Sequence, residues 1–149
     1  MTGPATIRLA TAADAASLAG LCEEHARYEH LPYQAAGHAE RLAMALQQAR
    51  LQAWLAEGAG QVLGYASTTL DYATLAGRAY LHLDCLYLRP EARGQGLGPA
   101  MLAAVCQHGR SQGCQELQWQ TPDWNQGAIR FYLRLGAQQR SKARFSLGL

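Results

Sequence analysis

The sequence predicts one mixed α/β domain, because segments with the periodicity of helices alternate with segments that have the periodicity of strands. Apolar residues three and four positions apart indicate four helices, and six shorter apolar segments indicate strands. The chain of 149 residues is long enough for a single core, and no linker or internal repeat divides it. We therefore expect one α/β (α+β) domain over residues 1–149, with its core beginning at about residue 6.

The first third of the chain is expected to form a short strand and two helices. The strand is expected at Thr6–Leu9. Thr11 then begins a capping box in weakened form, with Asp14 where glutamate or glutamine is preferred. Apolar residues at helical spacing predict a first helix from about Ala12 to Tyr28 and a second from about Ala39 to Gln48.

Three strands are expected in the middle of the chain. Residues 51–57 and 61–70 are joined by Gly58-Ala-Gly60, which is a good hairpin turn. A third strand is expected at 79–88. Its alternation assigns four residues to one face, namely Leu81, Leu83, Cys85 and Tyr87.

The last third is expected to contain two helices and two strands. One helix runs from about Pro99 to Gly113, where a glycine can adopt the left-handed conformation that ends a helix. A strand is expected at 116–120 and a short helix at 125–135. Residues 144–147 are expected to close the sheet.

The composition excludes several classes of function. The formal net charge is only +2 and the arginines are scattered, which argues against a nucleic-acid-binding face. No apolar run approaches the roughly 20 residues that cross a bilayer, and we expect no secretory signal. Four cysteines without metal-ligand spacing predict reduced thiols and no metal site. We therefore expect a cytoplasmic protein, and twelve arginines against one lysine favour a bacterial source.

A glycine-rich segment between the strand at 79–88 and the next helix carries the clearest functional signal. Glycines let a backbone approach a ligand closely, and the first N–H groups of a helix attract anions. A dinucleotide fingerprint does not fit, because Pro99 stands where Gly-x-Gly-x-x-Gly needs its third glycine. The phosphate loop of nucleotide triphosphatases does not fit either, because the only lysine is Lys142. We expect a pyrophosphate cradle, and the alternative is an ordinary glycine-rich turn.

Two motifs resemble those of the GCN5-related N-acetyltransferase superfamily. Arg93, Gly96 and Gly98 fit its pyrophosphate-loop pattern, Arg/Gln-x-x-Gly-x-Gly/Ala. Downstream, Asn125 and Tyr132 fit the superfamily's Asn-x-x-Ala-x-x-Phe-Tyr-x-x-x-Gly-Phe/Ala segment, with Asn125 where an N-cap is wanted. The resemblance covers essentially the whole chain. It implies a mixed, mostly antiparallel sheet of six to seven strands flanked by about four helices.

The resemblance implies acetyl-CoA as the co-substrate. Backbone groups at the end of the strand would hydrogen-bond the pantetheine as an added strand does, and the glycine loop would hold the pyrophosphate. In the superfamily the asparagine contacts pantetheine or a bound water, and the tyrosine donates a proton to the departing thiolate. The expected cofactor-binding residues are Leu86, Tyr87, Leu88, Arg93, Gly94, Gln95, Gly96, Leu97, Gly98, Pro99, Asn125 and Tyr132.

A narrower resemblance is to the spermidine/spermine and diamine acetyltransferase branch. It rests on the strand from Tyr80 to Tyr87, on the segment 123–125 and on the early segment 27–30. That branch carries Leu-Glu-Asp-Leu in the strand before the loop, whereas this chain has Asp84 and Cys85 at the acid pair. We therefore expect a small-molecule amine as substrate, with mono- or diamines preferred over long polyamines, and we expect a homodimer.

The chemistry of acyl transfer assigns roles to the acidic residues. A primary amine with a pKa near 10.4 is almost fully protonated at pH 7, so it must lose a proton before it attacks a thioester. Asp84 is the expected base, directly or through water, and Asp84 with Glu29 is expected to bind the amine. Tyr132 is expected to protonate the departing thiolate, and a backbone N–H between Leu86 and Leu88 would polarise the thioester carbonyl.

Each assignment has an alternative. Asp84 would otherwise be a surface carboxylate, Glu29 a solvated helix end and Tyr132 a tyrosine packed on the sheet. Cys85 as a covalent nucleophile would need a nearby base, and His82 is expected to point the other way, so direct attack is favoured. The alternative functions are acetylation of another amine (an aminoglycoside, an amino acid or a protein N-terminus) and a non-catalytic acyl-CoA sensor.

Overall fold

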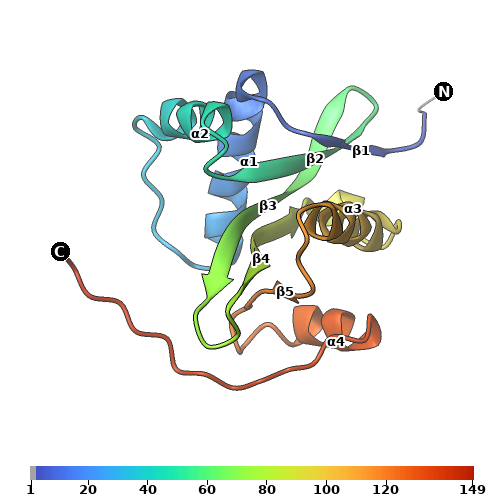
Figure 1. Ribbon diagram of the computed structural model, residues 1–149. Coiled ribbons are helices and arrows are strands. Elements are labelled where there is room, and N and C mark those ends of the chain that lie inside the picture. The colour runs from blue at the N-terminus through green and yellow to red at the C-terminus, as the bar shows by residue number, and fades with distance from the viewer. Residues whose placement is uncertain (1–2) are drawn as a thin grey trace. The chain divides into compact units, whose positions relative to one another are not determined.

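The structure is a computed structural model that describes residues 3–149 and consists of two compact units. The first unit ends at Trp119 and the second begins at Gln120. The first holds the whole sheet and three α-helices, and the second holds the remaining α-helix (Figure 1). The predicted α/β class with four α-helices is therefore confirmed.

The sheet of the first unit contains five strands in the order β1-β2-β3-β4-β5. Neighbouring strands are antiparallel except β4 and β5, which are parallel, so the expectation of a mixed, mostly antiparallel sheet is confirmed. The strands are β1 (Thr6–Leu9), β2 (Gln52–Gly58), β3 (Gln61–Ala73), β4 (Arg78–Leu88) and β5 (Leu117–Gln118).

The expected number of six to seven strands is wrong, since the described residues form five. The strand expected at 144–147 is absent from the described chain, and the one expected at 116–120 shrinks to two residues. Within the former, Phe145 and Leu147 are 89% and 87% exposed. A strand is stabilised by a hydrogen-bonded neighbour and a buried face, and residues 144–147 have neither here.

The helices begin and end within a few residues of their predicted positions. The first is preceded by a 3₁₀ turn, Ala12–Asp14, where the Thr11 backbone N–H donates to the Asp14 carboxylate at 2.7 Å. This bond is one half of the predicted capping box. The α-helices are α1 (Ala15–Tyr28), α2 (His38–Gln47), α3 (Leu97–Ser111) and α4 (Gln126–Arg134).

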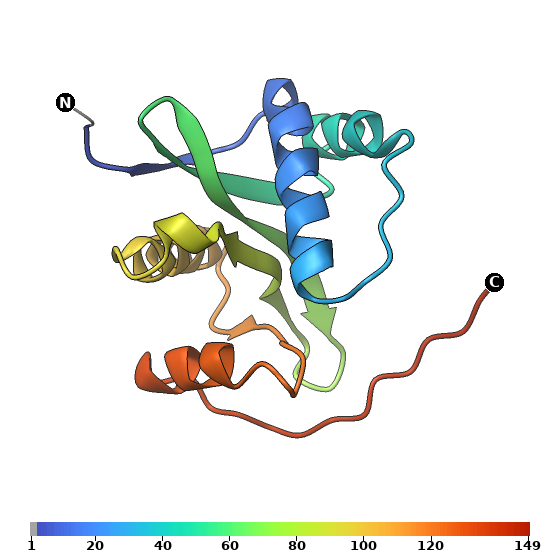
Figure 2. The same ribbon diagram turned by 180° about the vertical axis from the view of Figure 1, so that it is seen from behind.

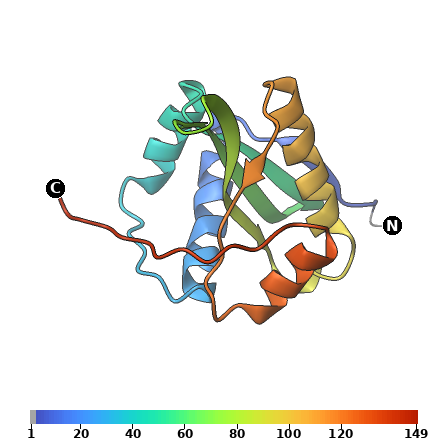
Figure 3. The same cartoon turned by 60° about the horizontal axis from the view of Figure 1, so that its bottom comes forward.

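Within the first unit, α1 and α3 cover opposite faces of the sheet (Figures 2 and 3). Adjacent residues of β2 demonstrate this arrangement, because side chains alternate between the faces of a strand. Leu55 belongs to the main core cluster together with Leu18 and Leu21 of α1. Trp54 contacts the His108 ring of α3 instead, with 5.3 Å between the ring centroids. The middle of the sheet is therefore buried on both sides.

A β-bulge at Asp84 interrupts the alternation of β4. Ser67 of β3 pairs with Cys85, but its neighbour Thr68 pairs with Leu83, so Asp84 is an extra residue on β4. An extra residue shifts the strand by one step and turns the following side chains to the other face.

The bulge corrects the face assignment made from the sequence. Leu81 lies beside Gly109 of α3, as expected for the α3 face. Tyr87 instead stacks on His25 of α1, with 5.2 Å between ring centroids, and Cys85 packs against the same core cluster. The predicted single face containing both Leu81 and Tyr87 is therefore wrong, because strict alternation does not hold across the bulge.

The two central strands approach closely at Gly64, where only a glycine fits. A Cβ atom there would clash with the Tyr87 carbonyl oxygen and would lie 3.0 Å from the Cα atom of Leu88. We expect Gly64→Ala to lower the free energy of unfolding by about 1–3 kcal/mol, because backbone atoms cannot yield as a flexible side chain can. Gly20→Ala is the matched control, since that exposed position in α1 has no atom within 4 Å.

We expect the control to raise stability by up to about 1 kcal/mol, because alanine is the better helix former. Urea unfolding curves of the three proteins measure both changes. Equal stability of Gly64→Ala and the unaltered protein would contradict the close approach of β3 and β4.

Candidate functional site

The loop that follows β4 exposes a row of backbone N–H groups at the start of α3. Gly94 and Gly96 have positive φ angles of 75° and 80°, which glycine adopts without strain, and Gly96 is the N-cap of α3. Within residues 3–149, no group accepts a hydrogen bond from the backbone N–H of Gly94, Gly96 or Gly98. A Cβ atom on Gly94 or Gly96 would meet nothing within 4 Å, so a ligand can approach both residues. This geometry fits an anion such as a pyrophosphate.

Arg89 fixes the base of this loop to two other elements. Its guanidinium is bidentate to the Glu24 carboxylate of α1, with Nη2–Oε2 at 2.8 Å and Nε–Oε1 at 3.1 Å. Its Nη1 donates to the Val62 carbonyl at 2.8 Å, and its backbone N–H donates to the Leu63 carbonyl at 2.8 Å. The glycine loop therefore starts from a rigid point. The two members of this pair are 65 residues apart, so no local sequence pattern reveals it.

Arg93, the first residue of the pyrophosphate pattern, lies at the edge of the same loop. Its Nε donates to the Leu88 carbonyl at 3.0 Å, and its guanidinium lies 5.0 Å from the ring centroid of Tyr28 and 5.8 Å from that of Tyr87. These contacts hold an exposed positive charge beside the free N–H groups. Gln95 also stabilises the loop, since its side-chain amide donates to the Glu91 carbonyl at 2.9 Å.

Asp84 is an exposed carboxylate on the bulge of β4, with 64% of its side chain accessible. Its Oδ1 lies 3.7 Å from Nε2 of His82. Its Oδ2 accepts a hydrogen bond from the Cys85 thiol, with 3.7 Å between oxygen and sulfur. Burial above all, and then the Asp84 charge, raise the pKa of the Cys85 thiol to about 12. The thiol is therefore neutral at physiological pH, which disfavours Cys85 as a covalent nucleophile.

Glu29 occupies a half-buried position at the end of α1, where its carboxylate forms an ion pair with Nε2 of His25. The other ring nitrogen of His25, Nδ1, lies 2.7 Å from the hydroxyl of Tyr65. Burial lowers the pKa of His25, while the charges of Glu29 and Asp84 act in the opposite direction. Both predicted acidic residues are thus close enough to act on one imidazole. His25 is a site residue that the sequence motifs did not single out.

The second motif lies in the second unit, where Asn125 caps α4. Its Oδ1 accepts a hydrogen bond from the backbone N–H of Ala128 at 3.3 Å, which confirms the predicted N-cap. Tyr132 follows within the helix, and its ring centroid lies 5.3 Å from that of Phe131.

Comparison with known proteins gives the family. The model of the acetyltransferase (GNAT) family matches residues 18–137. The chain belongs to this family. The chain is 30% identical over 122 residues to the thialysine N-epsilon-acetyltransferase of Caenorhabditis elegans. The matched region covers 79% of this chain and 73% of that protein. The chain is 37% identical over 82 residues to the enzyme of the same name from Bos taurus, which covers 55% of this chain. The chain spans about half the length of that relative and of others it matches.

Solved structures show the same fold. An aminoglycoside acetyltransferase from an uncultured soil metagenomic sample superposes with a TM-score of 0.84 at 16% identity, covering 97% of this chain and 96% of that one. An aminoglycoside N-acetyltransferase in complex with CoA superposes with a TM-score of 0.83 at 20% identity, covering 97% and 95%. The GNAT fold predicted from the two motifs is thereby confirmed.

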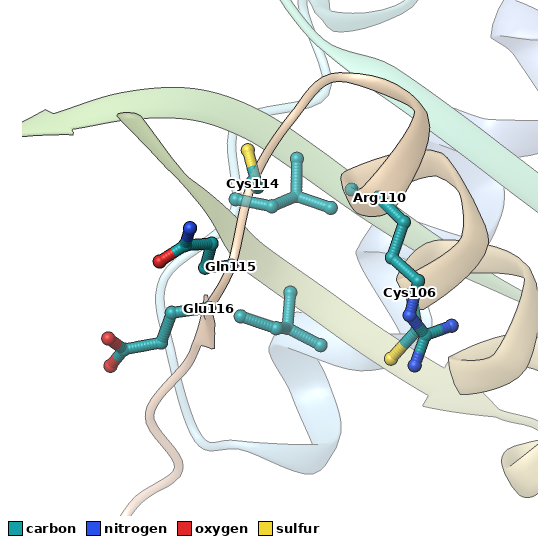
Figure 4. A pocket seen from close by; sticks show the side chains of 8 residues that line it. Cys106, Arg110, Cys114, Gln115 and Glu116 are labelled. Carbon is teal, nitrogen blue, oxygen red and sulfur yellow. The ribbon is translucent and has the colours of Figure 1, made fainter. Parts of the chain in front are cut away.

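A separate pocket of the GNAT chain, of about 190 Å³, lies where α3 ends and β5 begins (Figure 4). Cys106 and Arg110 line it from α3, and Cys114, Gln115 and Glu116 line it from the segment that leads into β5. None of the predicted site residues lines this pocket. Among the described residues, no group of three or more His, Cys, Asp or Glu side chains could hold a metal, and no helix is long and apolar enough to cross a membrane.

Proposed function

We propose that the protein is an N-acetyltransferase that moves the acetyl group of acetyl-CoA to the primary amine of a small molecule by direct attack. The observation that carries this proposal is the row of free N–H groups at Gly94, Gly96 and Gly98, placed directly after a strand that bears the exposed Asp84. Membership of the GNAT family supports it. We further propose that both units form one N-acetyltransferase domain, with its core over residues 6–149.

The donor would bind along the end of β4 and the glycine loop. Backbone groups of Leu86, Tyr87 and Leu88 would hydrogen-bond the pantetheine, and one N–H would polarise the thioester carbonyl. The N–H groups from Gly94 to Gly98 would bind the pyrophosphate, with Arg93 supplying a positive charge. The remaining residues proposed to contact the cofactor are Gln95, Leu97, Pro99, Asn125 and Tyr132.

The acceptor amine would bind beside Asp84, with help from Glu29. An exposed carboxylate attracts an ammonium ion and can take its proton directly or through water. The neutral thiol of Cys85 supports direct attack by the amine rather than an acyl-cysteine intermediate. Tyr132 would then donate a hydrogen bond, and finally a proton, to the departing thiolate of CoA.

The substrate class we favour is a small mono- or diamine. The similar proteins from Bos taurus and Caenorhabditis elegans are named for acetylation of thialysine, which supports a small-molecule amine. The aminoglycoside acetyltransferases with the same fold make an aminoglycoside the second candidate.

We further propose that the protein is a bacterial, cytoplasmic homodimer. The ratio of twelve arginines to one lysine supports a bacterial source, and four cysteines without disulfides among the described residues support a reducing compartment. The exposed apolar side chains of Leu70, Tyr72 and Leu75 on the β3–β4 hairpin support association of two copies.

Binding of the donor can be tested at Gly96. We expect Gly96→Asp to weaken acetyl-CoA binding at least tenfold, because it places a carboxylate against the proposed pyrophosphate position. Gly77→Asp is the matched control, since Gly77 also has a positive φ angle, 67°, with nothing within 4 Å of an added Cβ. Isothermal titration calorimetry measures both affinities. Equal affinity of Gly96→Asp and the unaltered protein would place the pyrophosphate elsewhere.

Protonation of the thiolate can be tested at Tyr132. We expect Tyr132→Phe to lower kcat by about 10²–10⁴-fold, the range typical of lost general acid catalysis, without changing the affinity for acetyl-CoA more than a few-fold. Tyr80→Phe is the control. Tyr80 lies near the start of β4, at the end away from the glycine loop, and its hydroxyl donates to the Asp71 carboxylate. CoA release in the presence of amine measures kcat. Unchanged turnover of Tyr132→Phe would exclude Tyr132 as the proton donor.

A further inference from the structure

The guanidinium of Arg93 is held at the edge of the glycine loop by uncharged groups. Its Nε donates to the Leu88 carbonyl at 3.0 Å. Its Cζ atom lies 5.0 Å from the ring centroid of Tyr28 and 5.8 Å from that of Tyr87. The centroids of these two rings are 6.3 Å apart and the rings are inclined by 50°, so the cation lies against both aromatic side chains.

Arg93 keeps its charge and most of its hydrogen-bonding capacity for a ligand. Within residues 3–149, no carboxylate forms an ion pair with it, and neither Nη1 nor Nη2 donates a hydrogen bond. Arg89 at the base of the same loop shows the opposite arrangement, because its guanidinium is bidentate to the Glu24 carboxylate. The N–H groups of Nη1 and Nη2 form a planar fork that matches the oxygens of a phosphate group.

Tyr28 supplies the nearer of the two rings and comes from a different element. It is the last residue of α1, and 39% of it is exposed. Tyr87 is only 7% exposed and stacks on His25, so its ring is fixed by the core. An arginine side chain without support samples many rotamers. Contact with the Tyr28 ring therefore restricts the positions that the guanidinium can occupy.

The position of Arg93 in the chain supports a pyrophosphate as its ligand. Arg93 directly precedes Gly94, whose backbone N–H has no acceptor within the part of the chain that the structure describes. The guanidinium and the free N–H groups of Gly94 and Gly96 thus belong to one short segment. An anion bound by these N–H groups lies beside the residue that carries the positive charge.

We propose that Tyr28 is a positioning residue that orients the Arg93 guanidinium toward the pyrophosphate of the donor. The inference rests on the proposed function, and Tyr28 acts through Arg93 without touching the pyrophosphate. Orientation before binding raises affinity, because the entropy of ordering a long side chain is lost before the ligand arrives. The face of the ring attracts the cation, so the aromatic ring of Tyr28 carries the effect and its hydroxyl does not.

The affinity for acetyl-CoA tests the role of the ring. We expect Tyr28→Leu to weaken binding by about three- to tenfold, because the guanidinium loses the nearer of its two rings. Tyr28→Phe should bind within about twofold of the unaltered protein, since the ring remains. Arg27→Ala is the matched control, because Arg27 is a neighbouring positive charge that pairs with Glu23 instead, and it should leave the affinity unchanged. Isothermal titration calorimetry measures all four affinities.

Shortened donors show which part of the cofactor Arg93 contacts. Acetyl-pantetheine lacks every phosphate, so Tyr28→Leu should leave its kcat/KM unchanged. Acetyl-CoA without the ribose 3′-phosphate keeps the pyrophosphate, so Tyr28→Leu should weaken its binding as much as that of acetyl-CoA. With acetyl-CoA, the KM for the donor should rise while kcat and the KM for the amine stay the same. A tyrosine that only stabilised the fold would affect all three donors alike.

Two further measurements apply if Tyr28→Leu lowers stability. In the Arg93→Ala background, Tyr28→Leu should not weaken binding further, because the group that it positions is gone. Arg93→Lys should weaken binding several-fold although it keeps the charge, because an ammonium group lacks the planar fork and the stacking of a guanidinium.

The proposal is overturned if Tyr28→Leu or Arg93→Lys binds acetyl-CoA as tightly as the unaltered protein, or if Tyr28→Phe or Arg27→Ala weakens binding as much as Tyr28→Leu does. It is also overturned if the loss persists in the Arg93→Ala background, extends to acetyl-pantetheine, or disappears when only the 3′-phosphate is removed. Each of these results leaves amine-dependent release of CoA by the unaltered protein intact. Failure of the proposed function is distinguishable, because the unaltered protein would then release no CoA with any amine.

Discussion

The one-residue bulge at Asp84 is the constraint on which the account of this GNAT chain depends. Without it, Cys85 and Tyr87 would face α3 together with Leu81. With it, Leu81 in the first half of β4 packs against α3, and Tyr87 in the second half packs against α1. Asp84 is exposed where the two halves meet. A single inserted residue therefore places an exposed carboxylate beside a shielded thiol, a few residues before the glycine loop.

The glycine loop and the acidic cluster are held by the same helix. Glu24 of α1 fixes Arg89 at the base of the loop, and the next residue, His25, contacts the Tyr65 hydroxyl and pairs with Glu29. The proposed donor and acceptor sides thus share α1 as well as β4. A change in the packing of α1 would affect both the affinity for the donor and the environment of the proposed base.

Local patterns in the sequence predicted the parts of the site that depend on neighbouring residues. The glycine loop and the Asn125 cap follow from turn and capping preferences over a few residues, and both appear at the expected positions. The bulge, the Arg89–Glu24 pair and the His25–Tyr65 contact join distant segments, so periodicity could not reveal them. The strand expected at 144–147 is wrong for a related reason, because a short local segment does not by itself supply a partner strand. The contribution of Tyr132 to the reaction stays a prediction from the motif.

The central claim is that β4 carries both the donor site and the acceptor carboxylate. The most direct test is the rate of CoA release when amines are added to the protein with acetyl-CoA. The account predicts that small mono- and diamines accelerate release. It also predicts that they exceed spermine by several-fold, because Cys85 stands where a second acid would attract another ammonium and exposed ion pairs contribute only about 0–1 kcal/mol each. Tight binding of acetyl-CoA with no amine-dependent release would contradict the account and would indicate a sensor.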